Sequence, residues 1–114
     1  MEKARRLYDT SAIIELTRRS TRRLDGYTTI LNVIEYPPAL NTGLIVIYPK
    51  RSDYDRALLL QLKLRKRGKP IPAVDLVVAA VALNRNLTLV SSNTHFSWVK
   101  EIEPDFSFMP LDET

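Results

Sequence analysis

The sequence has no cysteine and only one histidine, His95, in its 114 residues. The absence of cysteine excludes disulfide bonds, zinc–thiolate sites, iron–sulfur clusters and catalysis by a thiol nucleophile. A single histidine leaves a multi-histidine metal centre without ligands unless an oligomer pools them. A metal site within one chain would therefore depend on oxygen ligands.

Long hydrophobic runs are also missing. The longest nearly apolar run extends from Ile71 to Leu83, contains Asp75, and is too short to span a bilayer. The N-terminal stretch has a basic flank but no apolar core of the kind found in signal peptides. Only three residues are glycine, 45% are hydrophobic and 26% are charged, which is typical of neither a disordered nor a fibrous chain. We therefore expect a cytoplasmic protein with a single domain over residues 1–114 and no membrane partner.

Positive charge is unevenly distributed along the chain. The net charge is +4, residues 50–69 carry eight Lys or Arg against two acids, and residues 100–114 carry one Lys against five acids. A basic region attracts polyanions, so Lys63, Lys66 and Arg67 are candidate contacts to nucleic acid. The alternative is that these cations simply favour the carbonyl end of a helix.

Strand and helix patterns alternate along the whole chain. The predicted strands cover residues 5–8, 27–30, 44–48, 87–91 and 106–109, the last at a sheet edge. The predicted helices cover residues 12–19, 32–35, 52–67, 73–83 and 95–100. The run LIVIY at 44–48 is typical of a strand buried on both faces. Leucines around the 52–67 helix predict packing against the sheet and a further element. This alternation predicts a three-layer α/β/α fold around a mainly parallel sheet of about five strands.

Four polar residues lie where such a sheet would bind a ligand, beyond the carboxyl ends of its strands. Asp9 follows the first predicted strand and Asn93 follows the strand LTLVS. Asp75 is the only charged residue in IPAVDLVVAAVAL, and Glu35 lies in the apolar turn NVIEY. Each also has a structural interpretation: Asp9 as a helix cap, Asp75 as a first-turn acid, Glu35 as a surface residue and Asn93 as a turn residue.

The three acids together favour a metal site. Neither Asp9 nor Asp75 has a lysine or arginine partner within its own segment, and converging carboxylates repel one another unless a cation neutralises them. Mg²⁺ binds proteins through one or two carboxylates, water and substrate phosphate. Such an ion activates water and stabilises charge on a phosphodiester.

The same segments resemble a PIN domain, and within that family the VapC-type toxin ribonucleases. YDTSAII resembles the motif that supplies the first acid, here Asp9, with Ser11 as a supporting hydroxyl. GKPIPAVDLVVAAVALNRNLTLVSSNTHF resembles the motif with the third acid, Asp75, and the fourth ligand, Asn93. Glu35 in TTILNVIEY matches the second acid.

The resemblance covers essentially the whole chain and implies an endoribonuclease that uses Mg²⁺ or Mn²⁺. It also implies a homodimer, RNA as substrate and inhibition by a small VapB-like antitoxin. Asp9, Glu35, Asp75 and Asn93 would bind metal and carry catalysis. Two departures stand out. The interval from Glu35 to Asp75 is shorter than the family pattern, with Pro37 and Pro38 in place of further helix, and Asn93 stands where an acid is common.

Two alternatives were weighed against the nuclease. A PIN-like module that cleaves poorly and binds RNA or a protein partner would keep the fold and the basic surface. A phosphoacceptor receiver domain would need paired acids after its first strand and a lysine after its last. The chain has a lone Asp9 there and no lysine beyond Met109, so we reject the receiver.

Overall fold

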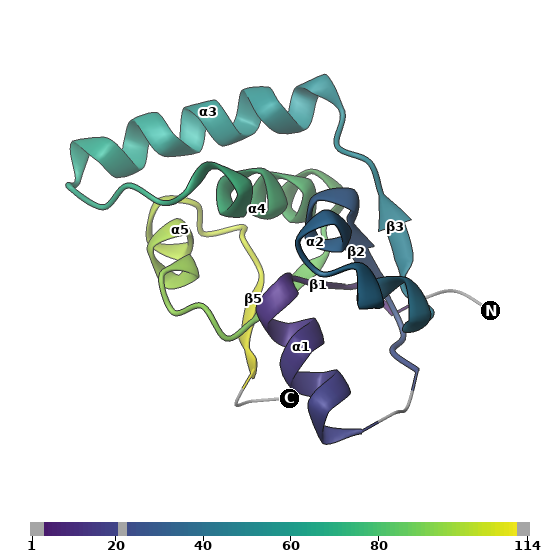
Figure 1. Cartoon of the computed structure of the whole chain (residues 1–114). Helices are drawn as coiled ribbons and strands as arrows, with labels where there is room; N and C mark the ends of the chain where they lie inside the picture. The colour runs from purple at the N-terminus through teal and green to yellow at the C-terminus, as the bar shows by residue number, and fades with distance from the viewer. Residues whose placement is uncertain (1–3, 21–22, 112–114) are drawn as a thin grey trace.

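The computed structural model describes residues 4–20 and 23–111, which form a parallel sheet covered by helices on both faces (Figure 1). The strands are β1 (Arg6–Tyr8), β2 (Tyr27–Thr29), β3 (Ile45–Ile47), β4 (Thr88–Ser91) and β5 (Phe108–Pro110). The helices are α1 (Thr10–Arg19), α2 (Ile30–Glu35), α3 (Arg51–Lys66), α4 (Ala73–Arg85) and α5 (Phe96–Ile102), with the 3₁₀ helix η1 (Pro37–Asn41). None of the helices in these ranges is long and apolar enough to cross a membrane.

The sheet order is β3-β2-β1-β4-β5, and every neighbouring pair is parallel. The chain builds outward from β1 to β3 on one side, then returns to place β4 and β5 on the other. The order therefore reverses between β1 and β4, which are paired with Leu7 opposite Leu89. Such a reversal leaves a crevice at the carboxyl ends of the two central strands.

Alternating side chains of the central strands define two core clusters. Leu7 and Leu89 belong to a cluster with α3, α4 and α5, whereas Tyr8 and Val90 belong to a second cluster with α1, α2 and η1. This period-two alternation is what places apolar side chains on both faces of each strand. The predicted three-layer arrangement and parallel sheet are confirmed.

The structure corrects three details of the expected elements. The LIVIY run is an edge strand, not a strand buried on both faces, and Ile45 is 44% exposed. Helix α3 packs mainly on α4 and α5, with Leu58, Leu59 and Leu62 facing solvent instead of the sheet. Strand β5 begins at Phe108, because Phe106 is fully buried in the preceding turn. The amino-acid composition of a segment indicates whether it forms a strand, but the order of strands in the sheet decides whether that strand lies at an edge.

The ends of two helices follow sequence expectation. Helix α2 stops at Glu35, before Pro37 and Pro38, which lack a backbone N–H to continue an α-helix. Helix α3 ends at Lys66, and Gly68 beyond it has φ +71°, a conformation that favours glycine. Between α2 and β3 the chain forms only η1 and a turn.

Candidate active site

The fold brings Asp9, Glu35, Asp75 and Asn93 to one pocket of about 390 Å³. Asp9 follows β1 and Asn93 lies two residues beyond β4, so both stand at the reversal of strand order. Glu35 is the last residue of α2, and Asp75 lies in the first turn of α4. The other described residues of the lining are Thr10, Ser11, Ile14 and Asn32, so the described part of the lining has no lysine or arginine.

Asp9 is 3% exposed and held by hydrogen bonds to both carboxylate oxygens. Its Oδ1 accepts from the Ala12 amide at 3.0 Å and the Ser11 hydroxyl at 2.7 Å, while Oδ2 accepts from the Ser91 hydroxyl at 2.5 Å. The Ala12 contact caps α1, as the structural interpretation of Asp9 expected. Capping and a place in the pocket are therefore compatible, because each carboxylate oxygen has two lone pairs.

Ser11 and Ser91 join the ends of the two central strands. The Ser11 hydroxyl accepts from the backbone N–H of Ser92 at 3.1 Å while donating to Asp9. The Ser91 hydroxyl accepts from the backbone N–H of Asn93 at 2.9 Å. These contacts fix the loop after β4 against the start of α1. The backbone position of Asn93 is thereby tied to Asp9 through one serine.

Asp75 has a partner that its own helix does not provide. Its Oδ2 lies 3.0 Å from Nε2 of His95, which is brought back to α4 by the loop after β4. The side chains of Asp75 and His95 are 23% and 25% exposed, so the pair lies at the surface of the pocket.

Glu35 is fixed by a directional chain of hydrogen bonds. The Thr29 hydroxyl donates to Oδ1 of Asn32 at 2.7 Å, and Nδ2 of Asn32 donates to the Thr10 hydroxyl at 3.0 Å. The Thr10 hydroxyl then donates to Oε1 of Glu35 at 2.6 Å. Because an amide nitrogen can only donate, the hydrogen of Thr10 must point to Glu35. The network thus holds an otherwise exposed side chain at the pocket rim.

The electrostatics of the pocket oppose ionisation of its two aspartates. Burial raises the pKa of Asp9, and the Asp75 charge adds to the rise, although hydrogen bonds from Ser91, Ala12 and Ser11 offset part of it. Burial also raises the pKa of Asp75, offset by His95 and reinforced by the Glu35 charge. Three carboxylates therefore interact unfavourably in a pocket without a fixed cation.

The donor set matches a hard divalent cation, because the polar groups facing the pocket carry carboxylate, amide and hydroxyl oxygens. However, within residues 4–20 and 23–111 no three His, Asp or Glu side chains are arranged to hold a metal ion by themselves. The residues fit an ion bound by one or two carboxylates with water and a substrate phosphate completing its coordination. Affinity for metal in the free protein should consequently be weak.

The candidate RNA contacts lie at the end of α3. A connecting segment, residues 67–72, leads from this basic end of α3 to the first turn of α4, which contains Asp75 (Figure 1). Lys63 forms an ion pair with Glu103 at 3.0 Å, while Lys66 and Arg67 have no ion pair with any described residue. Lys66 and Arg67 are thus better placed for phosphate contacts than Lys63.

Sequence reasoning missed Thr10 and Asn32 as lining residues of the pocket, and Ser91 and His95 as partners of its aspartates. Asn32 is 2% exposed, and its spacing of three residues from Thr29 and from Glu35 puts all three on one face of a helical turn. That spacing was the available signal. His95 carried none, because its contact with Asp75 joins residues twenty positions apart.

Comparison with known proteins first defines the class of fold. No known family profile matches the sequence, and no curated protein sequence matches it. Solved structures do match, and they share its parallel α/β sheet with helices on both faces.

Several of the matching structures are of VapBC proteins. A chain of VapBC-1 from nontypeable Haemophilus influenzae aligns with a TM-score of 0.72 and 20% identity over 94% of this chain and 98% of that one. VapBC-5 from Mycobacterium tuberculosis, a toxin–antitoxin system, gives 0.67 and 16% over 91% and 96%. DNA-bound VapBC from Salmonella typhimurium gives 0.66 and 18% over 97% and 99%. The chain has the fold of these proteins, which confirms the predicted PIN-like, VapC-like architecture.

Proposed function

We propose that this chain is a VapC-type endoribonuclease that depends on Mg²⁺ or Mn²⁺ and cleaves single-stranded or loop RNA. One observation carries the proposal: three carboxylates, Asp9, Glu35 and Asp75, line one pocket at the strand-order reversal, and no lysine or arginine of residues 4–20 and 23–111 lines it. The partners of these carboxylates among the described residues are hydroxyl groups, one backbone amide and one histidine, and no lysine or arginine neutralises them.

The residues of the pocket have distinct parts in the proposed reaction. Asp9 and Asp75 supply carboxylate oxygens to the cation, and Ser91 and Ser11 hold Asp9 in place. Glu35, aligned by Thr10, orients water at the rim, and Asn93 offers a neutral carbonyl oxygen. A bound divalent cation would supply a water activated for attack and would neutralise charge on the phosphodiester. Lys66 and Arg67 would contact RNA phosphates outside the pocket.

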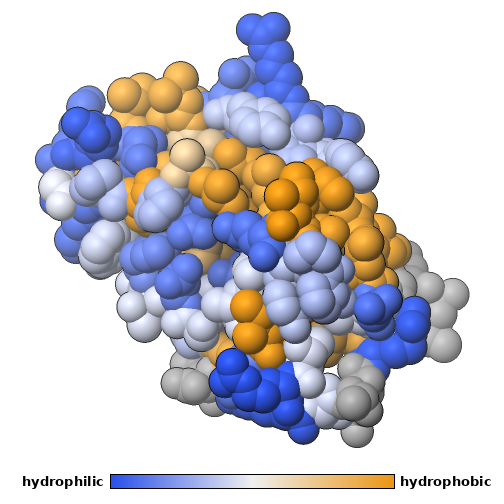
Figure 2. Space-filling model, viewed as in Figure 1, coloured by the Kyte–Doolittle hydropathy of each residue, from blue (hydrophilic) through white to orange (hydrophobic). Residues whose placement is uncertain are grey.

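The structural neighbours include toxin–antitoxin proteins, which favours a small VapB-like antitoxin as partner, and the resemblance to VapC favours a homodimer. This chain has apolar surface for such contacts. Figure 2 shows apolar side chains gathered over α3 and over α2, and the exposed ones include Leu58, Leu59, Leu62, Ile34 and Leu40. We propose that α3 and α2 contribute to interfaces with these partners.

Cleavage of a labelled structured RNA tests the proposal. We expect cleavage with Mn²⁺, none with EDTA, and a loss of more than about 100-fold in Asp75→Asn, larger than for residues that only support a ligand. The matched control is Asp55→Asn, because Asp55 is an exposed acid of α3 paired only with Arg51. Equal activity of wild type and Asp75→Asn would assign the cleavage to a contaminant or to another site.

The second candidate is a PIN-like binding module that cleaves RNA poorly. Asn93 favours it, because a neutral amide leaves the pocket one acid short of an all-carboxylate set. The same assay separates the two functions. RNA binding that persists without metal-dependent cleavage, at any Mn²⁺ concentration, would establish the binding module instead.

A further inference from the structure

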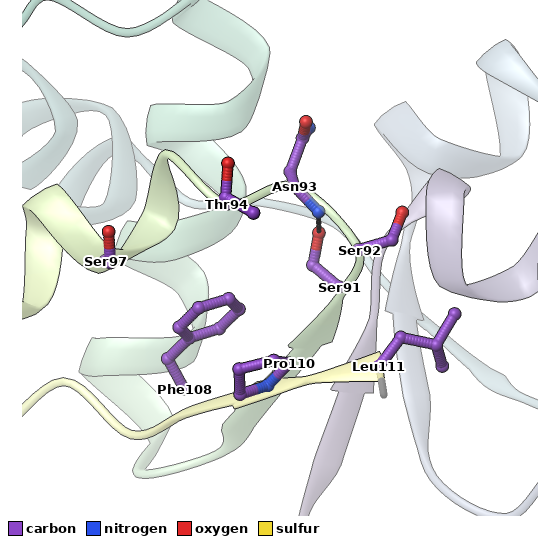
Figure 3. Close-up of a pocket in the computed structure, with 8 residues that line it drawn as sticks. All are labelled: Ser91, Ser92, Asn93, Thr94, Ser97, Phe108, Pro110 and Leu111. Carbon is purple, nitrogen blue, oxygen red and sulfur yellow. Dashed lines mark hydrogen bonds between the residues drawn. The ribbon is translucent and has the colours of Figure 1, made fainter. Parts of the chain in front are cut away.

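A second pocket, of about 210 Å³, lies beside the acid pocket and is separate from its carboxylates. It is formed by the loop after β4, the first turn of α5 and the strand β5, and its lining residues are Ser91, Ser92, Asn93, Thr94, Ser97, Phe108, Pro110 and Leu111. Figure 3 shows Asn93, Thr94 and Ser97 at one side of the pocket and Phe108 and Pro110 across from them, with the Asn93 side chain and the Thr94 hydroxyl directed outward, away from Phe108. Among the described residues, none of those that line this pocket is charged.

The polar rim of this pocket has unused hydrogen-bonding capacity. Among the described residues, no hydrogen bond involves the side chains of Ser92, Asn93, Thr94 or Ser97. Ser91, by contrast, is fully buried, and its hydroxyl donates to Asp9 and accepts from the backbone N–H of Asn93. The pocket therefore offers three hydroxyls, which donate and accept, and one amide, which does both.

The apolar side of the pocket is held rigid by other aromatic rings. Phe108 packs against Phe96 and Phe106, with ring centroids 5.9 and 6.2 Å away, and Phe106 and Phe96 are fully buried. A ring fixed in this way can receive a flat ligand without losing conformational freedom on binding. A cavity of about 150 Å³ is enough for one benzene ring, so 210 Å³ admits one aromatic group but not a large ligand.

One residue connects the two pockets. Asn93 lines both the hydroxyl-rimmed pocket and the acid pocket. A ligand that places a phosphate among the carboxylates and a flat heteroaromatic group beside Phe108 would span Asn93. Nucleotides have this composition, because each base is joined through its sugar to a phosphate.

We propose that the hydroxyl-rimmed pocket is a nucleobase subsite, which holds the base of the nucleotide adjoining the phosphate that is cut. The proposal rests on the proposed ribonuclease function. Phe108 provides the apolar face for the base. The hydroxyls of Thr94 and Ser97 and the side-chain amide of Asn93 form hydrogen bonds with its polar edge at the mouth of the pocket. The pocket would therefore give the enzyme a preference for particular bases at one position beside the cleavage site.

Binding is tested without cleavage by titrating uridine 5′-monophosphate and adenosine 5′-monophosphate into the metal-free protein while amide and aromatic NMR spectra are recorded. We expect the amide signals of residues 92–97 and the ring-proton signals of Phe108 to shift. Phe108→Leu should weaken binding about fivefold or more, the range for removing a stacking partner. Thr94→Val and Ser97→Ala, both at exposed positions, test the polar edge without risk to folding, and Ser52→Ala is the matched control on α3.

Cleavage of an RNA library randomised around one site supplies the second readout. Wild type should prefer certain bases at one position, and Thr94→Val and Ser97→Ala should flatten that preference about threefold or more while Mn²⁺ affinity is unchanged. Cleavage with unaltered preference in both variants, and no shifts with nucleotides, would overturn the subsite and leave the ribonuclease intact.

The remaining outcomes separate the two proposals from each other. Nucleotide shifts at residues 92–97 without any metal-dependent cleavage would support the subsite and overturn the ribonuclease. Shifts with N-acetylphenylalanine amide but not with either nucleotide would overturn the subsite, because the pocket would then hold an apolar side chain of a protein partner.

Discussion

The protein buries carboxylates in two regions, and only one of these carboxylates is paired with an arginine. Asp53, at the start of α3, is completely buried and forms a two-pronged ion pair with Arg85 of α4, at 2.9 and 3.0 Å. It also accepts from Asn84 at 2.8 Å and from the Lys50 amide at 2.7 Å. Asp9, at the carboxyl end of the central strand β1, is almost as buried. Its donors are two hydroxyls and one backbone amide, and no described lysine or arginine pairs with it.

The pKa directions follow from this difference. Burial alone would raise the pKa of Asp53, but hydrogen bonds from Arg85, Lys50 and Asn84, together with the Arg85 charge, lower it below its ordinary value. Burial raises the pKa of Asp9 and of Asp75, and neighbouring acids add to it. The Asp53–Arg85 pair thus joins two helices, whereas the acid pocket retains charge that an added cation could neutralise.

Breaking the ion pair should give the largest effect. We expect Asp53→Ala to lower the free energy of unfolding by about 3 kcal/mol, because it leaves the Arg85 charge unpaired between α3 and α4. Urea denaturation measures the change. Asp55→Ala, at an exposed position two residues later, should stay within about 0.5 kcal/mol. Equal effects of the two substitutions would show that the buried pair does not stabilise the fold.

Adding a cation should stabilise the acid pocket and leave the ion pair unaffected. At a Mn²⁺ concentration of 100 times Kd, the wild-type free energy of unfolding should rise by about 2.7 kcal/mol. Asp75→Asn should lose this gain, and Asp55→Asn should keep it. Thermal melts in EDTA and in Mn²⁺ provide the measurement, and equal gains in all three proteins would place the ion elsewhere.

The hydrogen-bond chain to Glu35 provides a finer test of the pocket. We expect Thr10→Val to weaken Mn²⁺ binding about tenfold, the lower range for a group that orients a metal ligand. Thr10→Ser keeps the hydroxyl and should restore most of the affinity. Calorimetric titration distinguishes the two variants. Equal weakening would contradict the assigned role of the hydrogen bond, because Thr10→Ser keeps the hydroxyl and loses only the methyl group.

The smallest effect concerns pH. A carboxylate with a raised folded pKa contributes stability that is present below its unfolded pKa, about 3.9, and is lost as pH rises through the folded value. Metal-free wild type should therefore lose stability above about pH 4 through Asp9, and Asp9→Asn should be more stable at pH 7 by about 1 kcal/mol.

Asp53 has the opposite sign, because its lowered pKa contributes stability that is full above pH 3.9 and lost as pH falls. Urea midpoints across pH 3–7 separate the two contributions. A flat difference between wild type and Asp9→Asn over that range would contradict the assigned origin of the Asp9 shift.

The sequence predicted the central features of the site from local signals. Asp9 after a strand, Asp75 in an apolar helix and Asn93 after another strand follow from hydropathy and turn residues, and the structure brings them to one pocket. Their roles in metal binding and catalysis stay predictions. The alternation of strand and helix patterns predicted the layered fold, because parallel strands require helical crossovers.

The ion pair and the network around Glu35 could not be predicted in the same way. Asp53 looked like an ordinary acid in the first turn of a helix, and its partner Arg85 is thirty-two residues away. Thr10 and Asn32 lie twenty-two residues apart, and they meet because β1 and β2 pair side by side. Neither pairing leaves a periodic signal in the chain.

The sequence by itself determined that α4 is buried, where most helices begin and end, and which acids lie beyond strand ends, because these depend on side-chain hydropathy and backbone preference over a few residues. Only the tertiary structure decided that β3 is an edge, that Asp53 gains an arginine while Asp9 gains hydroxyls, and that Asn93 faces two pockets. Those outcomes depend on which distant segments share a sheet edge or a helix face, and the free energy of such contacts is set by three-dimensional proximity.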